Sequence, residues 1–565
     1  METRKMIIYQ VLPRLFGNDK GTNNTNGSIE ENGSGKLSAF SKKTLTEIKR
    51  MGYSHIWYTG LIEHATQTDY SSFNIAKDHP AIVKGKAGSP YAIKDYYDID
   101  PDLADDIDER MVEFEALVKR THEAGLKVIL DFVPNHVARQ YHSDVKPNHI
   151  FDLGANDNIQ TTYDVNNNFY YIPGQSFDPQ FDLEADSSKY EEFPAKATGN
   201  NHFDARPSCN DWYETIKLNY GIDFLGGGAC YFDPAPDTWH KMLKILLFWS
   251  SKKVDAFRCD MAEMVPVEFW SWAIPQVKEE YPSVVFIAEI YHPDAYRNYL
   301  SIGKFDYLYD KVGMYDTLRA VICGEENASA ITSCWQSVDD IRDRMLYFLE
   351  NHDEQRIASA FFSKDPRRAF PAMIVAATLY TNPLMVYFGQ ELGESGMEAE
   401  GFSGIDGRTT IFDYWSIKSI RDWRNKGKFG FQNLSDQQKE VRNFYIKLLT
   451  LCNKEKAIYK GVSYDLMYAN YENPRFNSHK QYAYLRQLGN ELLLIVANFD
   501  EQEADIAIFL PAHAFEFMHI PPDVKTVGKD LFSGKEIHSS LCADSFFELS
   551  VMPWNGKILK FTINE

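Results

Sequence analysis

Eight short apolar runs recur along the chain, and stretches with helical spacing of apolar residues separate most of them. Short continuous apolar runs are typical of strands buried on both faces, and their alternation with helices is typical of a parallel sheet. The pattern therefore predicts an α/β fold, a (β/α)₈ TIM barrel, whose functional groups come from the carboxyl ends of the strands. The runs are 6–12, 56–59, 128–133, 254–260, 284–289, 305–308, 345–349 and 384–388.

The alternation is interrupted once and later ends. Between His136 and Pro236 the chain is rich in Asn, Asp, Tyr and Phe and shows no helix-strand rhythm. A segment of about a hundred residues is too long for a connecting loop, so we predict an inserted subdomain after the third strand. After a helix near 444–452, short alternating runs such as 481–486 and 491–498 predict a C-terminal antiparallel β-sandwich.

These changes of pattern divide the chain into four predicted segments, of which two belong to the barrel. They are 1–136, the first part of the barrel; 137–237, the inserted subdomain; 238–457, the second part of the barrel; and 458–565, the C-terminal β-sandwich.

The charge and the cysteines restrict the partners and the compartment. The net charge is −21, whereas a nucleic-acid partner needs a basic face, so we expect none. Seven cysteines without CxxC spacing read as free thiols in a reducing compartment. The first apolar segment is too short for a signal peptide or a membrane span. We therefore predict a cytoplasmic protein without a membrane partner, although a processed periplasmic protein would show the same sequence; the oligomeric state stays open.

Three of the predicted strands end in carboxylic acids. Residues two apart on a strand point to the same face, so Arg258 and Asp260 would project side by side. The guanidinium would lower the pKa of Asp260 and keep it ionised. Glu289 ends an apolar run with no basic neighbour in the sequence, and desolvation there would raise its pKa. Asp353 follows the seventh run.

Two carboxyl groups with separated pKa values meet the requirement for cleaving a glycosidic bond. Asp260 would be the ionised group and Glu289 the protonated one. Asp353 could bind sugar hydroxyls and stabilise positive charge at the anomeric carbon. Aromatic residues make up 14% of the chain, an excess that often serves as stacking platforms for sugar rings.

The chain resembles the alpha-amylase family of glycoside hydrolases in four short motifs that occur in the family's order. These are 131–136, 257–260, 286–289 and 348–353. The similarity extends to further segments, so it spans nearly the whole chain. These further segments are 88–96, 217–219, 389–391 and 553–556. Segment 217–219 is similar to a motif of neopullulanase-like and cyclomaltodextrinase-like members.

The resemblance implies a role for each matched residue. Asp260 would be the nucleophile that forms a covalent glycosyl intermediate, Glu289 the general acid and then base, and Asp353 the transition-state stabiliser. Anomeric configuration would be retained. Arg258 would orient Asp260, and the residues expected to hold the sugar are Tyr91, His136, Arg258 and His352.

No cofactor is expected for the chemistry, but a structural calcium ion is an open alternative. Asn135 matches a position that ligates calcium in many members of the family. Many calcium-binding members carry a Lys-His pair shortly after the nucleophile, where this chain has Glu263 and Met264, which is a departure. The Asn- and Gly-rich loop 17–27 could also surround a calcium ion, or be a solvated cluster of turns.

We therefore expect a retaining hydrolase of α-1,4-linked glucans or malto-oligosaccharides. One alternative is an α-glucan transglycosylase, which would share every catalytic residue, and another is a cyclomaltodextrinase-like or neopullulanase-like activity. A more remote one is a sugar-binding protein without catalysis, which would be expected to have lost one or more of the carboxylates. The sequence does not decide between α-1,4 and α-1,6 links or between chain lengths.

Overall fold

A closed parallel sheet forms the centre of the molecule. The computed structural model describes residues 4–182, 184–185, 188–402, 404–524 and 527–563. Eight strands lie in the order β17-β16-β15-β14-β5-β2-β1-β18, and a parallel bridge from Tyr347 to Leu384 joins the two edges. The predicted (β/α)₈ barrel is confirmed. The strands are β1 (Ile7–Val11), β2 (His55–Tyr58), β5 (Lys127–Phe132), β14 (Ala256–Cys259), β15 (Val285–Ala288), β16 (Tyr307–Tyr309), β17 (Met345–Leu346) and β18 (Leu384–Tyr387).

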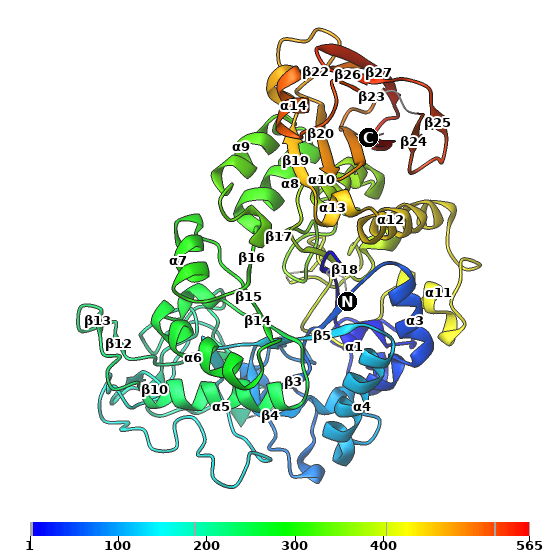
Figure 1. The fold of residues 1–565 in the computed structure, drawn as a ribbon. Helices are drawn as coiled ribbons and strands as arrows, with labels where there is room; N and C mark the ends of the chain where they lie inside the picture. Colours follow the sequence, from blue (N-terminus) through cyan, green and yellow to red (C-terminus); the bar gives the residue numbers. More distant parts are fainter. Residues whose placement is uncertain (1–3, 183, 186–187, 403, 525–526, 564–565) are drawn as a thin grey trace.

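Helices follow the barrel strands and surround the sheet (Figure 1). Local signals set several of their ends: the Ser41 side chain accepts a hydrogen bond from Thr44 N, and Ser435 and Gln438 form a capping box. The helix expected near 444–452 forms, as part of a longer helix. The main ones are α3 (Lys42–Arg50), α4 (Arg110–Glu123), α5 (Asp237–Ser251), α6 (Val267–Glu280), α7 (Tyr296–Ser301), α8 (Asp316–Cys323), α9 (Ala330–Ser337), α10 (Phe370–Thr378), α11 (Lys418–Arg424) and α12 (Asp436–Lys454).

The side chains of strand β14 point alternately toward the surrounding helices and toward the interior of the barrel. Phe257 and Cys259 belong to the large core between the sheet and the helices. Ala256 belongs to a separate, smaller core inside the barrel. Because side chains alternate along a strand, Arg258 and Asp260 share the inward face with Ala256. The sequence thus delivers both charged groups to the carboxyl end of the barrel interior.

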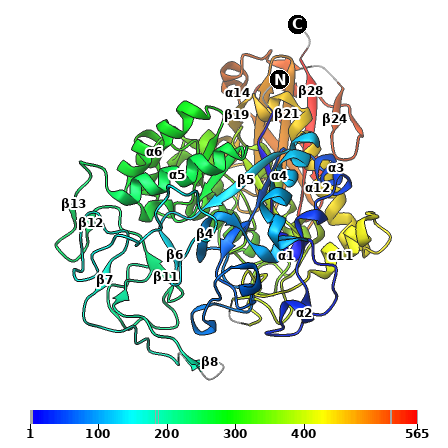
Figure 2. The same cartoon turned by 90° about the horizontal axis from the view of Figure 1, so that it is seen from below.

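The described residues between β5 and α5 form short strands joined by loops, and in Figures 1 and 2 this segment lies to one side of the barrel. Strand β6 pairs antiparallel with β11, and Lys217 lies opposite His136 in this register. An inserted unit is therefore present here, while its limits at 137 and 237 stay a prediction. The strands are β6 (His136–Ala138), β7 (Tyr171–Ile172), β8 (Glu184–Ala185), β9 (Ser188–Lys189), β10 (Ala195–Lys196), β11 (Thr215–Lys217), β12 (Ile222–Asp223) and β13 (Ala229–Cys230).

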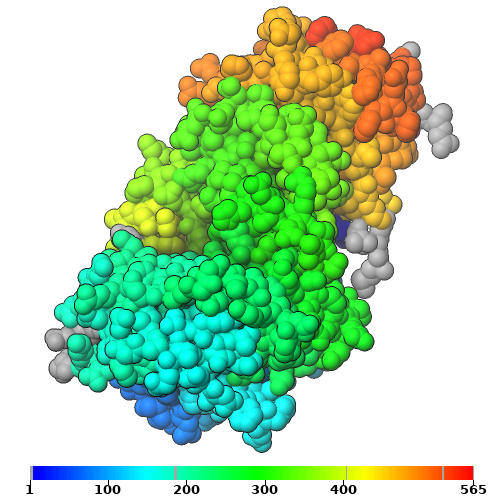
Figure 3. All heavy atoms as spheres, turned by 90° about the vertical axis from the view of Figure 1, so that its left-hand side faces the viewer, coloured from blue at the N-terminus to red at the C-terminus, as the bar shows by residue number. Residues whose placement is uncertain are grey.

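The C-terminal part forms antiparallel sheets at one end of the molecule, orange to red in Figure 3. A six-stranded sheet has the order β19-β20-β21-β28-β24-β25, and β22 pairs with β27 in a second sheet. Arg486 Nη1 donates to Leu379 O at 2.7 Å, which ties this part to the barrel after α10. The predicted antiparallel architecture is confirmed. The strands are β19 (Val462–Asp465), β20 (Gln481–Leu488), β21 (Glu491–Asn498), β22 (Ala504–Leu510), β24 (Gly528–Asp530), β25 (Glu536–Ile537), β27 (Ser545–Val551) and β28 (Asn555–Thr562).

None of the helices in the described part of the chain combines the length and the apolar character that crossing a bilayer requires.

Candidate active site

The three carboxylates predicted from strand ends meet in one place. Asp260, Glu289 and Asp353 line the same cavity, whose volume is about 370 Å³. The register of β14 and β15 pairs Cys259 with Ala288, so the next residue of each strand, Asp260 and Glu289, are neighbours. Asp353 reaches the cavity from the loop after β17 and is the most exposed of the three, at 35% of its side chain.

Arg258 lies between the carboxylates of three neighbouring strands. Its Nη1 donates to Asp260 Oδ1 at 2.6 Å and contacts Asp131 Oδ1 at 3.4 Å. Its Nη2 is 2.7 Å from Glu289 Oε1. Glu289 therefore has a basic neighbour in space, although none stands beside it in the sequence. The reason is tertiary: adjacent strands lie about 4.8 Å apart, so a long side chain of β14 reaches residues of β5 and β15.

Arg258 lowers the pKa of Asp260 as predicted, but the net shift of this pKa is upward. Burial raises the pKa of Asp260 well above its usual value, and the Arg258 guanidinium opposes this increase without cancelling it. Burial likewise raises the pKa of Asp131 and of Asp353 to about 7. The carboxyl groups of Asp131, Asp260 and Glu289 thus share the buried Arg258 guanidinium. Such a cluster holds a proton near neutral pH while other members are ionised, as acid-nucleophile chemistry requires.

Hydrogen-bond donors hold the Glu289 carboxyl in position. Tyr291 donates its hydroxyl hydrogen to Oε1 at 2.9 Å, and the Met261 N–H donates to Oε2 at 2.8 Å. Met261 has a left-handed backbone, with φ 42° and ψ 43°. A residue with a side chain adopts this conformation only when its surroundings enforce it. Here the turn after Asp260 aims a backbone donor at the neighbouring carboxyl group.

The residues predicted to bind the sugar line the same cavity or support it. His352 Nε2 is 2.6 Å from Tyr91 Oη and 3.1 Å from Asp353 Oδ2. On the other side of the ring, His352 Nδ1 is 2.8 Å from Gln10 Nε2. Tyr91 and His352 are stacked with ring centroids 5.1 Å apart. Burial lowers the pKa of His352 well below its usual value and that of His136 to about 3. Both imidazoles are therefore neutral and suited to hydrogen-bonding hydroxyl groups.

Sequence reasoning missed several residues of the site. Asp131 stood in a matched motif without a role, yet the register pairs it with Arg258, and Trp57 Nε1 donates to it at 2.8 Å. An inward-facing acid at the end of the third strand was the available signal. Tyr291 and Trp212 carried no local signal, because the tyrosine lies in a loop and the tryptophan comes from the inserted segment, 5.3 Å from the His136 ring.

Asn135, the predicted calcium ligand, is in contact with an amino group. Lys217 Nζ donates to Asn135 Oδ1 and, at 3.2 Å, to the carbonyl oxygen of Met264. Asn135 Nδ2 donates to Gly199 O at 2.9 Å. A cation bound to Asn135 would need the position that Lys217 Nζ takes, so these donors do not fit a calcium ion.

Loop 17–27 uses its polar side chains for other contacts. Asn18 Nδ2 donates to the carbonyl oxygens of Asn32 and Trp415, both at 2.9 Å. Asn23 Oδ1 accepts from Ser416 N at 3.0 Å. These bonds tie the loop to the segment after β18, and this observation favours the reading as a cluster of turns.

The chain is similar to several known proteins in sequence and in fold. It matches the family model "Alpha amylase, catalytic domain" over residues 10–444. It is 21% identical to Alpha-amylase 2 of Dictyoglomus thermophilum, over 89% of this chain and 70% of the relative. It is 20% identical to Neopullulanase 2 of Thermoactinomyces vulgaris, over 98% and 77%. The solved maltogenic alpha-amylase AmyB of Thermotoga neapolitana shares the fold, with a TM-score of 0.64, 20% identity and coverage of 100% of both chains.

Proposed function

Because the chain belongs to the alpha-amylase family, and is thus a glycoside hydrolase, we propose that it cleaves α-1,4-linked glucans or malto-oligosaccharides with retention of configuration. One observation carries this proposal. Asp260, Glu289 and Asp353 line one cavity, and the Arg258 guanidinium contacts both Asp260 and Glu289. Contact with the same guanidinium supports a short separation of the two carboxyl groups. The covalent route needs about 5–5.5 Å between them, against 6.5–9.5 Å in inverting enzymes.

The proposed reaction has two displacement steps. In the first, an Asp260 oxygen forms a bond to the anomeric carbon while Glu289 gives its proton to the departing glycosidic oxygen. In the second, Glu289 takes a proton from water, whose oxygen attacks the same carbon and releases Asp260. The two donors to Glu289, Tyr291 and the Met261 N–H, keep its carboxyl aimed through both steps.

The other residues act on the sugar during these steps. Asp353 Oδ2 and His352 Nε2 are 3.1 Å apart. Both would form hydrogen bonds with hydroxyl groups of the sugar whose bond is cleaved. The Tyr91 ring would stack against that sugar, and His136, which lines the same cavity, would bind one of its hydroxyls. These contacts favour a flattened, positively charged ring, because the surrounding carboxylates stabilise that charge.

Substrate preference is the finer part of the proposal. The names of the compared proteins include an alpha-amylase, a neopullulanase and a maltogenic alpha-amylase. Segment 217–219 also resembles the neopullulanase-like motif. We therefore expect short malto-oligosaccharides and cyclodextrins to be cleaved alongside starch.

Product analysis on maltotriose, starch, pullulan and cyclodextrin tests this expectation. Maltotriose should give maltose and glucose with the α configuration at the newly formed end, seen by proton NMR in the first minutes. A first product with the β configuration would contradict the covalent mechanism. Early products longer than maltotriose would show that another sugar competes with water, and would replace the hydrolase by the transglycosylase alternative.

We also propose that calcium is not required at Asn135, because the Lys217 amino group already makes the contact with Asn135 Oδ1 that the ion would make. EDTA should leave the thermal midpoint and the activity of the wild type unchanged. Lys217→Met should lose about 1–3 kcal/mol in urea unfolding, since the buried Asn135 Oδ1 and the partly buried Met264 carbonyl oxygen would each lose a donor. Lys244→Met, at an exposed position of α5, is the matched control and should stay within about 0.5 kcal/mol. A drop in thermal midpoint with EDTA that calcium restores would contradict the proposal.

A further inference from the structure

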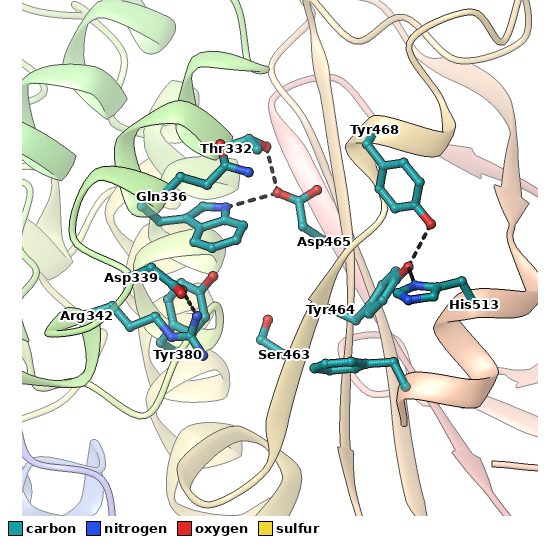
Figure 4. A pocket seen from close by; sticks show the side chains of 12 residues that line it. Thr332, Gln336, Asp339, Arg342, Tyr380, Ser463, Tyr464, Asp465, Tyr468 and His513 are labelled. Atoms are coloured by element: carbon teal, nitrogen blue, oxygen red, sulfur yellow. Dashed lines mark hydrogen bonds and ion pairs between the residues drawn. The ribbon is translucent and has the colours of Figure 1, made fainter. Parts of the chain in front are cut away.

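A second cavity lies between the barrel and the C-terminal sheets (Figure 4). Its volume is about 560 Å³, and none of its lining residues belongs to the candidate active site. One wall comes from α9 and the turn after it, with Thr332, Gln336, Asp339 and Arg342. The other comes from β19 and from α14 (Ala512–Phe517). A cavity of this size is in the ~300–1,000 Å³ range that binds small molecules.

Aromatic rings line this cavity at several depths. Trp335 and Tyr380 stand on the barrel side, with ring centroids 5.7 Å apart. On the opposite side the Tyr464 ring is 5.4 Å from Phe517 and 6.2 Å from Tyr468. Tyr468 is 53% exposed and Phe517 52% exposed. Large rings left open to water at the rim of a cavity mark a binding surface rather than a core.

Polar groups between the rings are held in fixed positions. Asp465 Oδ2 accepts from Thr332 Oγ1 at 2.6 Å and from Trp335 Nε1 at 3.0 Å, which locks the indole across the domain boundary. The Tyr464 hydroxyl is 2.7 Å from His513 Nδ1. Ser463 Oγ is buried and has no hydrogen-bond partner within the described chain, and its side chain points into the space between the walls. A buried hydroxyl without a partner is rare, and a bound ligand would satisfy it.

The charges of the walls indicate a neutral ligand. Arg342 is paired with Asp339, and its guanidinium also lies 4.5 Å above the Tyr380 ring. Asp465 already accepts hydrogen bonds from both domains. Neither group is therefore available to bind an ion. Aromatic faces combined with hydroxyl, imidazole and amide groups suit a molecule that has apolar faces and a rim of hydroxyl groups.

We propose that this cavity is a second binding site for α-glucan chains, separate from the site of cleavage. The inference rests on the proposed substrate class. A chain held against Tyr468 and Phe517 would increase the local concentration of a long glucan at the enzyme. It would add nothing for a substrate too short to use both sites.

Binding of maltoheptaose tests the proposal directly. In the Asp260→Asn background, which keeps the glucan intact, isothermal titration should resolve two binding events. Tyr468→Ala or Phe517→Ala should abolish one event, and both changes are tolerable because the rings are half exposed. The matched control is Phe546→Ala, a ring of the same domain that is 55% exposed and outside the cavity; it should keep both events.

Kinetics with an intact Asp260 give a second readout. Tyr468→Ala and Phe517→Ala should raise KM for soluble starch about three- to tenfold, the usual effect of losing a stacked ring. Their kcat/KM for maltotriose should stay at the wild-type value.

The outcomes separate this inference from the proposed function. One binding event in the parent, or two events that neither substitution changes, would overturn the second site while cleavage remains intact. Failure to cleave any glucan would overturn the proposed function, and a maltoheptaose event that Tyr468→Ala removes would still support the second site. If the substitutions change the mass in ultracentrifugation and leave glucan binding unchanged, the rings form a contact between copies of the chain and the proposal is wrong.

Discussion

Asp260→Asn should lower kcat for maltotriose by at least about 10⁴-fold, because an amide is not a nucleophile toward an anomeric carbon. The fold should persist. Asn has nearly the shape of Asp, and its Oδ1 can still accept the hydrogen bond that Arg258 Nη1 donates to Asp260 at 2.6 Å. Some affinity for malto-oligosaccharides should also persist, since Tyr91 and His352 are unchanged.

The measurement is the steady-state rate together with circular dichroism and a binding titration. Asp255→Asn makes the same change near the start of the 254–260 run, where Asp255 Oδ2 accepts a hydrogen bond from Val128 N at 2.8 Å. This matched control should keep at least about a tenth of the wild-type kcat, because it lies away from the cavity. Wild-type turnover by Asp260→Asn would remove the nucleophile assignment.

Glu289→Gln should produce the second large effect, a decrease of about 10²–10⁴-fold in kcat/KM for maltotriose. The lost proton matters most for a poor leaving group such as a sugar hydroxyl. The decrease should therefore be much smaller for 4-nitrophenyl maltoside, whose leaving group departs without protonation. Without its general base the second step also slows, so a glycosyl adduct on Asp260 should accumulate.

Two observations check this assignment. Mass spectrometry of the denatured variant should find the adduct on the peptide that contains Asp260. Azide, which needs no general base, should accelerate turnover and give a glycosyl azide of retained configuration. Glu263→Gln is the matched control: its Oε2 accepts from Tyr291 N at 3.2 Å outside the cavity, so its effect should stay below about tenfold. Equal losses on both substrates would contradict a role as acid.

Several features of the fold and site could be predicted because they depend on local pattern. A continuous apolar run buries a strand, and its last residues are then presented at one end of the barrel. This is why the amino-acid order is enough to place Asp260 and Glu289 at that end. The sixth and seventh strands are less regular in sequence, and their bounds are Tyr307–Tyr309 and Met345–Leu346 rather than the full apolar runs. The sandwich was predicted from the alternation in β20 and β21, a local signal as well.

The sequence by itself determined the barrel, the order of its parts and the three carboxylates, because period and chain order are local properties. Only the tertiary structure decided which side chains from different elements are in contact. Arg258 reaches Glu289 as well as Asp260, and Lys217 of the inserted segment contacts Asn135. The second cavity forms between α9 and β19, two elements that are far apart in the chain. Contacts of this kind depend on strand spacing and side-chain reach across neighbouring elements, and no short stretch of sequence encodes those distances.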